Sequence, residues 1–348
     1  SVSTSGVQTF SIYAKANDSN WISLWTNVGT SYFDLANGTK GSTTASTTIG
    51  SEMESVGNGW YRCSLIFNTS ILNIRIYPTD GDLDTSGTSG SIYIQDAQLE
   101  EGLVARDYIE TTTSAVYGGI TDNIPRLDYS GGASCPSLLL EPQRTNIFDS
   151  SEYLTTIDPD LTQSVSDIIS PISNVKYLKI LKNNSGVARI VKTSSAGVYT
   201  YSVFAKQGSD GGNTIQFADS YFGFGSLDVS FDLSIGAFNG TPSGNGLIDY
   251  GFEDFGNGSY RVWTSFNHNP TTSVNTEVRS PAIFLDDNQL GVNEYIYLLG
   301  FQFENGSYPT SYIPTFGTFT TRNVDEFYNT TTFNDIMPNP ELTWIIDI

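Results

Sequence analysis

One twelve-residue string occurs in two versions in this chain: VGNGWYRCSLIF at residues 56–67 and FGNGSYRVWTSF at residues 255–266. The Asn-Gly pair in each version predicts a tight hairpin turn, because both central positions of a type I′ turn need a positive φ. After each turn the side chains alternate between two faces, which is typical of a strand with one buried face. The repeated string therefore predicts one hairpin that is built twice.

Other strings recur in the same order on both sides of this hairpin. Residues 6–15 (GVQTFSIYAK) match residues 197–206 (GVYTYSVFAK), and residues 92–102 (IYIQDAQLEEG) match residues 296–306 (IYLLGFQFENG). The offset between matched residues changes only from 191 (Gly6 to Gly197) to 204 (Ile92 to Ile296). Loop insertions between fixed strands produce a change of this size, so the sequence indicates one module used twice.

The composition indicates the fold class of that module. The 348 residues include 33 Gly, 20 Tyr and 20 Phe, and short β-rich runs alternate with Gly, Asn and Asp clusters. This pattern favours an all-β protein made of tandem antiparallel jelly-roll β-sandwiches. The one stretch where we expect a turn of helix is Asp158–Ile169.

The repeats divide the chain into four parts. We expect a first jelly-roll module at residues 1–111, an ordered inter-module linker at 112–145, a second module at 146–316, and at 317–348 a linker with the first strand of a further domain. Residues 177–180 and 188–192 are strand candidates without a counterpart in the first copy. We therefore expect that the first module lacks its opening strands and that both ends of the chain are cuts through a longer polypeptide. The apolar residues 138–140 predict that the linker is ordered by docking between the modules or onto a neighbouring chain.

Charge and cysteine content exclude several functional classes. The net charge is −21, whereas a protein that binds nucleic acid or an anionic membrane surface needs positive charge. No run of about 18 apolar residues is present, so we expect no membrane insertion. Cys63 and Cys135 do not form a disulfide framework, and Cys63 is expected to be a small buried hydrophobe.

The sequence offers little that could catalyse a reaction. Its single histidine, His268, is expected in a turn, where it would lack the orientation that a Ser-His-Asp system requires. Glu100 and Glu101 are adjacent in a strand and point to opposite faces, so they cannot face each other across a glycosidic bond. We therefore predict no catalytic residues and a protein that is not an enzyme.

One acidic loop is a weak candidate for a structural calcium site, the only cofactor that we consider. Asp80, Asp82 and Asp84 stand at alternate positions, but the spacing of an EF-hand is not met. The alternative is a solvated acidic loop that binds no metal.

Sugar binding by a β-sandwich needs aromatic faces for stacking and a few planar hydrogen-bonding groups for hydroxyls. The candidate residues are Trp21, Trp25, Trp60, Arg62, Gln98, Arg261, Trp263 and Gln302. The Arg and Gln positions recur in both copies, as do Glu100 and Glu304. The alternative interpretation is that these polar residues form a network that fastens adjacent strands, and that the Trp residues serve packing.

Several strings together resemble a repeated module of bacteriophage head-fibre and tail-fibre proteins. They are FSIYAK (10–15), FDLANG (33–38), GNGWYRC (57–63), QLEEG (98–102), SYIPT (311–315), TRNVD (321–325) and, most specifically, PRLDYSGGASCPSLLLEPQRTN (125–146). The chain departs from the pattern at Ser259, which replaces the Trp of GNGWYR, and at Arg106-Asp107, which replace the Thr-Ser of TSY.

The resemblance implies modules similar to carbohydrate-binding modules in a homotrimeric fibre on the virion surface. Its partners would be further copies of itself, other virion proteins and a host-cell-surface glycan. It also implies that ELTWIIDI (341–348) opens a lectin-like domain. Two alternatives remain open: a secreted bacterial carbohydrate-binding adhesin, or the non-catalytic part of a polysaccharide depolymerase.

Overall fold

The computed structural model describes residues 6–44, 48–69, 73–86, 89–116, 126–128, 137–172, 175–185, 189–192, 194–209, 212–219, 227–244, 246–268, 281–285 and 290–325. Cys135 and the expected lectin-like strand at 341–348 lie outside these ranges. Within them, no helix is long and apolar enough to cross a membrane.

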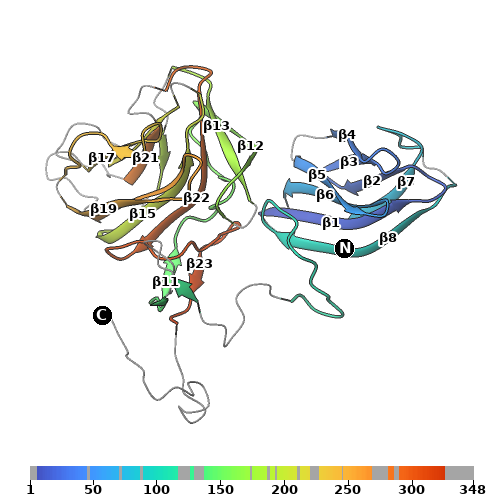
Figure 1. Ribbon diagram of the computed structural model, residues 1–348, viewed down its shortest axis with the longest axis horizontal. Helices are drawn as coiled ribbons and strands as arrows, with labels where there is room; N and C mark the ends of the chain where they lie inside the picture. Colours follow the sequence, from blue (N-terminus) through green and yellow to red (C-terminus); the bar gives the residue numbers. More distant parts are fainter. Residues whose placement is uncertain are drawn as a thin grey trace, which may run out of the picture. The chain divides into compact units, whose positions relative to one another are not determined.

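The first copy of the repeat, here called module 1, is built from two four-stranded antiparallel sheets (Figure 1). Its back sheet has the order β5 (Thr48–Gly57), β6 (Trp60–Asn68), β1 (Val7–Ala16) and β8 (Ile92–Glu101). Its front sheet has the order β4 (Thr39–Thr44), β3 (Gly29–Asp34), β2 (Trp21–Thr26) and β7 (Ile74–Thr79). Apolar side chains from both sheets, including Ile12, Ile22, Leu24 and Leu65, form one buried cluster between them.

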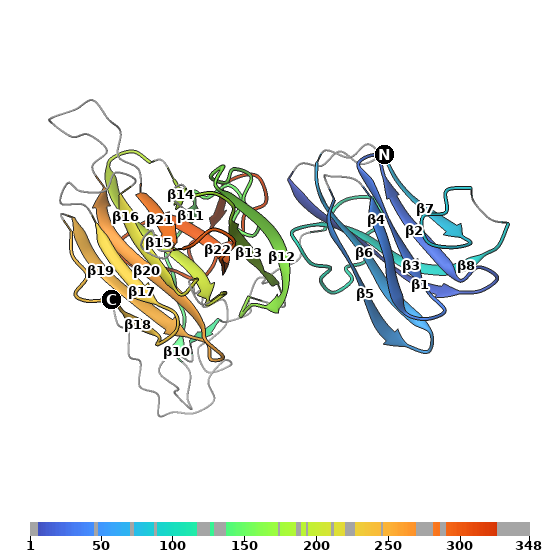
Figure 2. The ribbon, with the colours of Figure 1, turned by 90° about the horizontal axis from the view of Figure 1, so that it is seen from above.

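The second copy, module 2, has the same plan with more strands. Its back sheet has the order β12 (Leu161–Ile169), β13 (Lys176–Lys182), β22 (Tyr295–Asn305), β15 (Gly197–Lys206), β20 (Ser259–His268) and β19 (Leu247–Asp254). Figure 2 shows these strands beside one another from β19 to β12. Its front sheet has the order β14 (Arg189–Val191), β21 (Pro281–Leu285), β16 (Thr214–Asp219), β17 (Asp228–Asp232) and β18 (Ala237–Phe238).

The two modules match strand for strand, and the all-β prediction is confirmed. The order β5-β6-β1-β8 corresponds to β19-β20-β15-β22, and β4-β3-β2-β7 corresponds to β18-β17-β16-β21. Within the described residues, β12, β13 and β14 have no counterpart in module 1.

The expected helical turn at Asp158–Ile169 is wrong. Leu161–Ile169 is strand β12, because its backbone pairs with β13 along the edge of the back sheet.

The Asn-Gly turns have the backbone that the sequence requires. Asn58 and Gly59 have φ values of 53° and 76°, and Asn257 and Gly258 have values of 54° and 70°. Positive φ at both central positions matches the right-handed twist of the flanking strands. Each turn therefore fixes the register of β5 with β6, or of β19 with β20.

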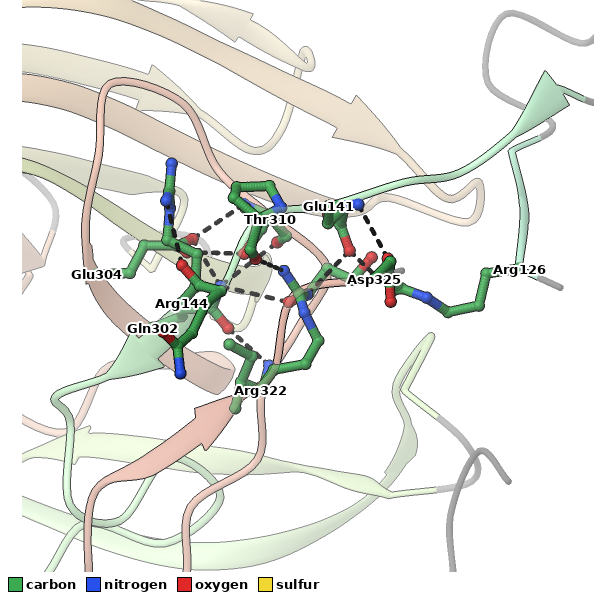
Figure 3. Close-up of polar contacts among 12 residues, drawn as sticks. Arg126, Glu141, Arg144, Gln302, Glu304, Thr310, Arg322 and Asp325 are labelled. Atoms are coloured by element: carbon green, nitrogen blue, oxygen red, sulfur yellow. Dashed lines mark hydrogen bonds and ion pairs between the residues drawn. The ribbon is translucent and has the colours of Figure 1, made fainter. Parts of the chain in front are cut away.

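Of the described residues, 126–128, 137–144 and 322–325 belong to a separate small unit. Strands β9 (Leu127–Asp128) and β10 (Ser137–Leu138) pair within it. Strand β11 (Arg144–Asn146) pairs with β23 (Thr320–Arg322). The Nη1 atoms of Arg126 and Arg322 lie 2.7 Å and 2.9 Å from Glu141 Oε2, and Arg126 Nη2 also contacts Asp325 (Figure 3). These ion pairs, rather than buried leucines, hold the described linker residues: Leu138 and Leu140 are 40% and 55% exposed.

Cys63 is fully buried in the core of module 1, as the sequence predicts. Burial raises the pKa of its thiol from 9.0 to about 12, because the charged thiolate would lose its hydration.

We therefore expect the Cys63 thiol not to react while module 1 is folded. In a Cys135→Ser variant, a disulfide reagent such as dithionitrobenzoate at pH 8 should label no thiol in the native protein and one thiol in denaturant. Labelling of the native variant at the rate of a free cysteine would contradict the buried position.

Candidate functional site

The central strand of the front sheet in module 1 carries two tryptophans on the face turned away from the core. Ile22 and Leu24 of β2 are 0% exposed and point into the sandwich. Because side chains alternate along a strand, Trp21 and Trp25 lie on the opposite face, and both are half-buried.

The neighbouring strands add aromatic and basic groups to this face. Tyr32 of β3 and Tyr77 of β7 both lie opposite Ser23 of β2, between the two tryptophans, and Arg75 of β7 lies opposite Trp25. The Arg75 guanidinium lies 4.7 Å from the centre of the Trp25 ring, and its Nη1 donates to Tyr77 Oη at 3.1 Å. We call Trp21, Trp25, Tyr32, Tyr77 and Arg75 the aromatic face.

An acidic loop borders the aromatic face beside Trp21. Asp82 accepts hydrogen bonds from Ser42 N at 2.7 Å and from Ser42 Oγ at 2.8 Å. A Cβ built on Gly41 would lie 2.6 Å from Asp82 and 2.7 Å from the Trp21 ring, so the loop and the indole both lie against Gly41. The pKa of buried Tyr32 is raised, first by burial and then by the charges of Asp82 and Asp84.

The aspartates proposed for calcium are engaged in local hydrogen bonds. Asp84 accepts from Ser86 N at 2.9 Å and from Asp80 N at 3.1 Å, and Asp82 is bonded to Ser42. In the part of the chain that is described, no three His, Cys, Asp or Glu side chains are grouped to hold a metal ion.

The structure does not bring the other two tryptophans to the aromatic face. Trp60 lies on β6 of the back sheet, opposite Lys15. Trp263 lies on β20 of module 2 and faces Gly251, where a built Cβ would be 2.6 Å from the indole. The four candidate tryptophans therefore lie on three separate strands, β2, β6 and β20. Sugar binding by Trp60 or Trp263 stays a prediction.

In module 1, the polar candidates Arg62 and Gln98 hold the segment that follows the last strand. Arg62 Nη1 and Nη2 donate to the carbonyls of Ala105 and Arg106, and Nη2 donates to Ser11 Oγ at 3.2 Å. Gln98 Nε2 donates to Glu100 Oε1 at 2.8 Å, and Gln98 Oε1 accepts from Ile109 N at 2.8 Å.

Module 2 repeats this network at deeper burial. Arg261 Nη2 donates to Ser202 Oγ at 3.2 Å and to Thr310 O at 2.6 Å. Gln302 Nε2 donates to Glu304 Oε1 at 2.7 Å, and Gln302 Oε1 accepts from Ile313 N at 2.7 Å. Gln302 and Glu304 are 0% exposed, and Figure 3 draws both together with Thr310.

We call residues 105–109 and 310–313 the straps, because the network ties each of them across the outer face of a back sheet. The main-chain groups of the straps occupy hydrogen-bonding positions of Arg62, Gln98, Arg261 and Gln302. The contacts therefore favour the fastening interpretation for these four residues, and a role in sugar binding stays a prediction.

Sequence reasoning placed His268 in a turn, which is wrong. It is the last residue of β20, is 3% exposed, and its ring lies 6.4 Å from the rings of both Tyr199 and Phe266. The strand continues to His268, because this residue pairs with Gly197 of β15.

Sequence reasoning also missed Tyr32, Arg75 and Tyr77. The alternation in IRIYPT (74–79) places Arg75 and Tyr77 on one strand face. Their meeting with Trp25 depends on the pairing of β7 with β2, which are far apart in the sequence.

The fastening network predicts a loss of stability when one of its members is removed. Gln302→Leu leaves the amide of Ile313 buried without its acceptor, so we expect the free energy of unfolding of module 2 to fall by about 2–3 kcal/mol. In calorimetry this corresponds to a fall of roughly 5–10 °C in its melting temperature.

Gln98→Leu is the matched control in module 1. Gln98 is half-buried, so water can replace part of the hydrogen bonding that the substitution removes. We therefore expect the free energy of unfolding of module 1 to fall by less than about 1 kcal/mol. Equal, negligible effects of both substitutions would contradict the fastening role.

Comparisons with known proteins add a distant structural likeness. No protein-family model matches the chain, and no curated protein matches it. Among solved structures, the N-terminal CBM22-1–CBM22-2 tandem domain of Xyn10C from Paenibacillus barcinonensis matches with 10% identity and a TM-score of 0.25, over 87% of this chain and 79% of that chain. So weak a likeness assigns no ligand to this chain.

Proposed function

We propose that this protein binds a glycan through the aromatic face of module 1. The observation that carries the proposal is the pair Trp21 and Trp25, which stand half-buried at alternate positions of β2 on the face turned away from the core. Indole rings in this position offer stacking surfaces to the apolar face of a pyranose.

Polar groups beside the indoles suit the hydroxyls of the same sugar. Arg75 stacks over Trp25 and reaches Tyr77 Oη, so its guanidinium is held in place while Tyr77 is 39% exposed. A rigid aromatic surface with a few oriented donors is the usual composition of a small-molecule site. The neighbouring carboxylates Asp82 and Asp84 are hydrogen-bonded to Ser42 and Ser86.

Module 2 does not repeat the aromatic face. The strand registers place Thr214 and Ala218 of β16 where module 1 has Trp21 and Trp25, and Ser230 where it has Tyr32. Gln216 at the centre of β16 donates to Asp228 Oδ1 at 2.8 Å. We therefore assign glycan binding by the front sheet to module 1.

We further propose that the chain belongs to a homotrimeric phage fibre on the virion surface, where it contacts other virion proteins and a host-cell-surface glycan. The support is the resemblance of its repeated strings to fibre proteins, together with the tandem arrangement of two modules with strapped ends. Repetition in three copies raises the avidity of weak sugar contacts.

Sedimentation equilibrium tests the homotrimer. We expect a mass three times the 37.9 kDa of the chain, independent of concentration in the micromolar range. A monomer at all concentrations would contradict the trimeric fibre and would favour a monomeric adhesin.

Substitution of the aromatic face tests the sugar site. Against the polysaccharide that gives the strongest signal in a screen of bacterial surface glycans, Trp25→Ala should weaken binding roughly thirtyfold, because about 2 kcal/mol of stacking and burial is lost. Affinity electrophoresis measures the effect, and circular dichroism checks that each variant folds.

Tyr250→Ala is the matched control, because it removes an exposed aromatic ring from strand β19 of module 2. We expect it to leave the affinity unchanged. Undiminished binding by Trp25→Ala, or equal weakening by both variants, would contradict the assignment of the site to the aromatic face.

A further inference from the structure

Module 2 contains a cleft at the end of the sandwich where its Asn-Gly turn lies. The cleft has a volume of about 450 Å³, within the range of small-molecule sites. The residues that line it are Lys206, Gln207, Gly208, Leu233, Ser234, Asn257, Gly258 and Tyr260. They come from the end of β15, the β17–β18 turn and the β19–β20 turn.

The cleft combines an apolar wall with polar groups at its rim. Leu233 and the ring of Tyr260 supply the wall; Tyr260 packs edge-on against Phe231 at 5.3 Å, which fixes its orientation. Among the described lining residues, Lys206 is the one that carries a charge. The surface of the cleft is therefore cationic in a chain whose net charge is −21.

Several hydrogen-bonding groups of the cleft retain capacity for a ligand. Lys206 Nζ donates to Asn257 O and has two further N–H groups. In the part of the chain that the structure describes, no contact engages the side-chain amides of Gln207 and Asn257. Nearby Asp232 accepts from Ser234 N and Oγ at 2.8 Å and 2.6 Å, so this carboxylate is committed to its own turn.

Two glycines lie against side chains that line the cleft. Gly258 has a φ of 70°, and a Cβ built there would lie 3.6 Å from Lys206 Nζ, beside the ammonium group. Gly236 has a φ of 65°, and a Cβ there would meet Tyr260 Oη at 2.5 Å. The tyrosine can occupy this position only because residue 236 lacks a side chain.

Module 1 has the same construction at its corresponding end. Lys15 and the turn Asn58-Gly59 occupy the places of Lys206 and Asn257-Gly258, and a Cβ on Gly38 would lie 2.8 Å from Tyr61 Oη. In module 1, Trp60 lies opposite the lysine, whereas module 2 has the small Ser259 there. Ser259 is 7% exposed and is not among the residues that line the cleft.

We propose that this cleft of module 2 binds the carboxylated sugar residue of an acidic saccharide. Lys206 pairs with the carboxylate, the amides of Gln207 and Asn257 bond the hydroxyls, and the Tyr260 ring contacts the apolar edge of the pyranose. The cleft is on module 2 and shares no residue with the aromatic face of module 1. Loss of binding at one site therefore does not imply loss at the other.

The test uses the full chain carrying Trp25→Ala, so that the aromatic face of module 1 does not contribute. Isothermal titration calorimetry measures binding of three carboxylated probes (digalacturonate, dimannuronate and N-acetylneuraminate) and of the methyl ester of each. At least one acid should bind with one site per chain, and its uncharged ester should bind at least tenfold more weakly, because the ester cannot pair with the ammonium group.

Lys206→Met keeps most of the apolar stem of the lysine and removes its charge. We expect it to weaken binding of the acidic probe at least tenfold, with an unchanged melting temperature. Lys40→Met is the matched control, since it removes an exposed positive charge from module 1, and it should leave the affinity as it was.

Three results would overturn the proposal. The first is the absence of binding by all three acids at concentrations up to about 10 mM, tenfold above a dissociation constant of about 1 mM. The second is equal affinity for an acid and its ester. The third is undiminished binding by Lys206→Met in a folded protein.

Discussion

The hydrogen-bond network that ties each strap to its back sheet is the constraint on which the rest of the structure depends. In both modules a guanidinium, a carboxamide and a carboxylate bond the main chain of the segment that leaves the last strand. In module 2 these groups are buried, so each missing partner would cost the full desolvation of a polar atom, whereas Gln98 and Glu100 of module 1 are half-buried. The network therefore fixes where each module ends and uses much of the polar surface of its back sheet.

The two modules share the fastening network of their back sheets, but they differ in the side chains of their front sheets and of their Asn-Gly ends. The front sheet of module 1 presents Trp21 and Trp25, while module 2 has Thr214 and Ala218 at the same register positions. At the Asn-Gly end, module 1 has Trp60 opposite its lysine, where module 2 has Ser259. The two proposed binding surfaces therefore lie on different modules of a duplicated scaffold.

Much of the fold was predictable from the sequence because its signals are local. The Asn-Gly turns and the alternating strands beside them identify the hairpins, and the matched strings identify the duplication. The Leu161–Ile169 strand was missed because its polar alternation lacks a strong β signal, and its conformation is decided by pairing with β13.

The candidate site was predicted only in part, for a physical reason. Trp21 and Trp25 could be chosen because two aromatic residues on one strand face are visible in a single string. Tyr32 and Tyr77 reach them through strand pairing, which no single string reveals. Arg62 and Gln302 suggested a ligand site because groups that bind a sugar hydroxyl also bind a main-chain carbonyl, and only the position of the strap distinguishes the two.

Hydrogen–deuterium exchange of the strap amides tests the central claim most directly. Thr310 N and Ile313 N donate to Glu304 Oε1 and Gln302 Oε1, both fully buried. The fastening network predicts that these amides exchange as slowly as those of the core strands, with or without added saccharide. Exchange at the rate of an exposed loop, or protection that appears only when saccharide is bound, would contradict it.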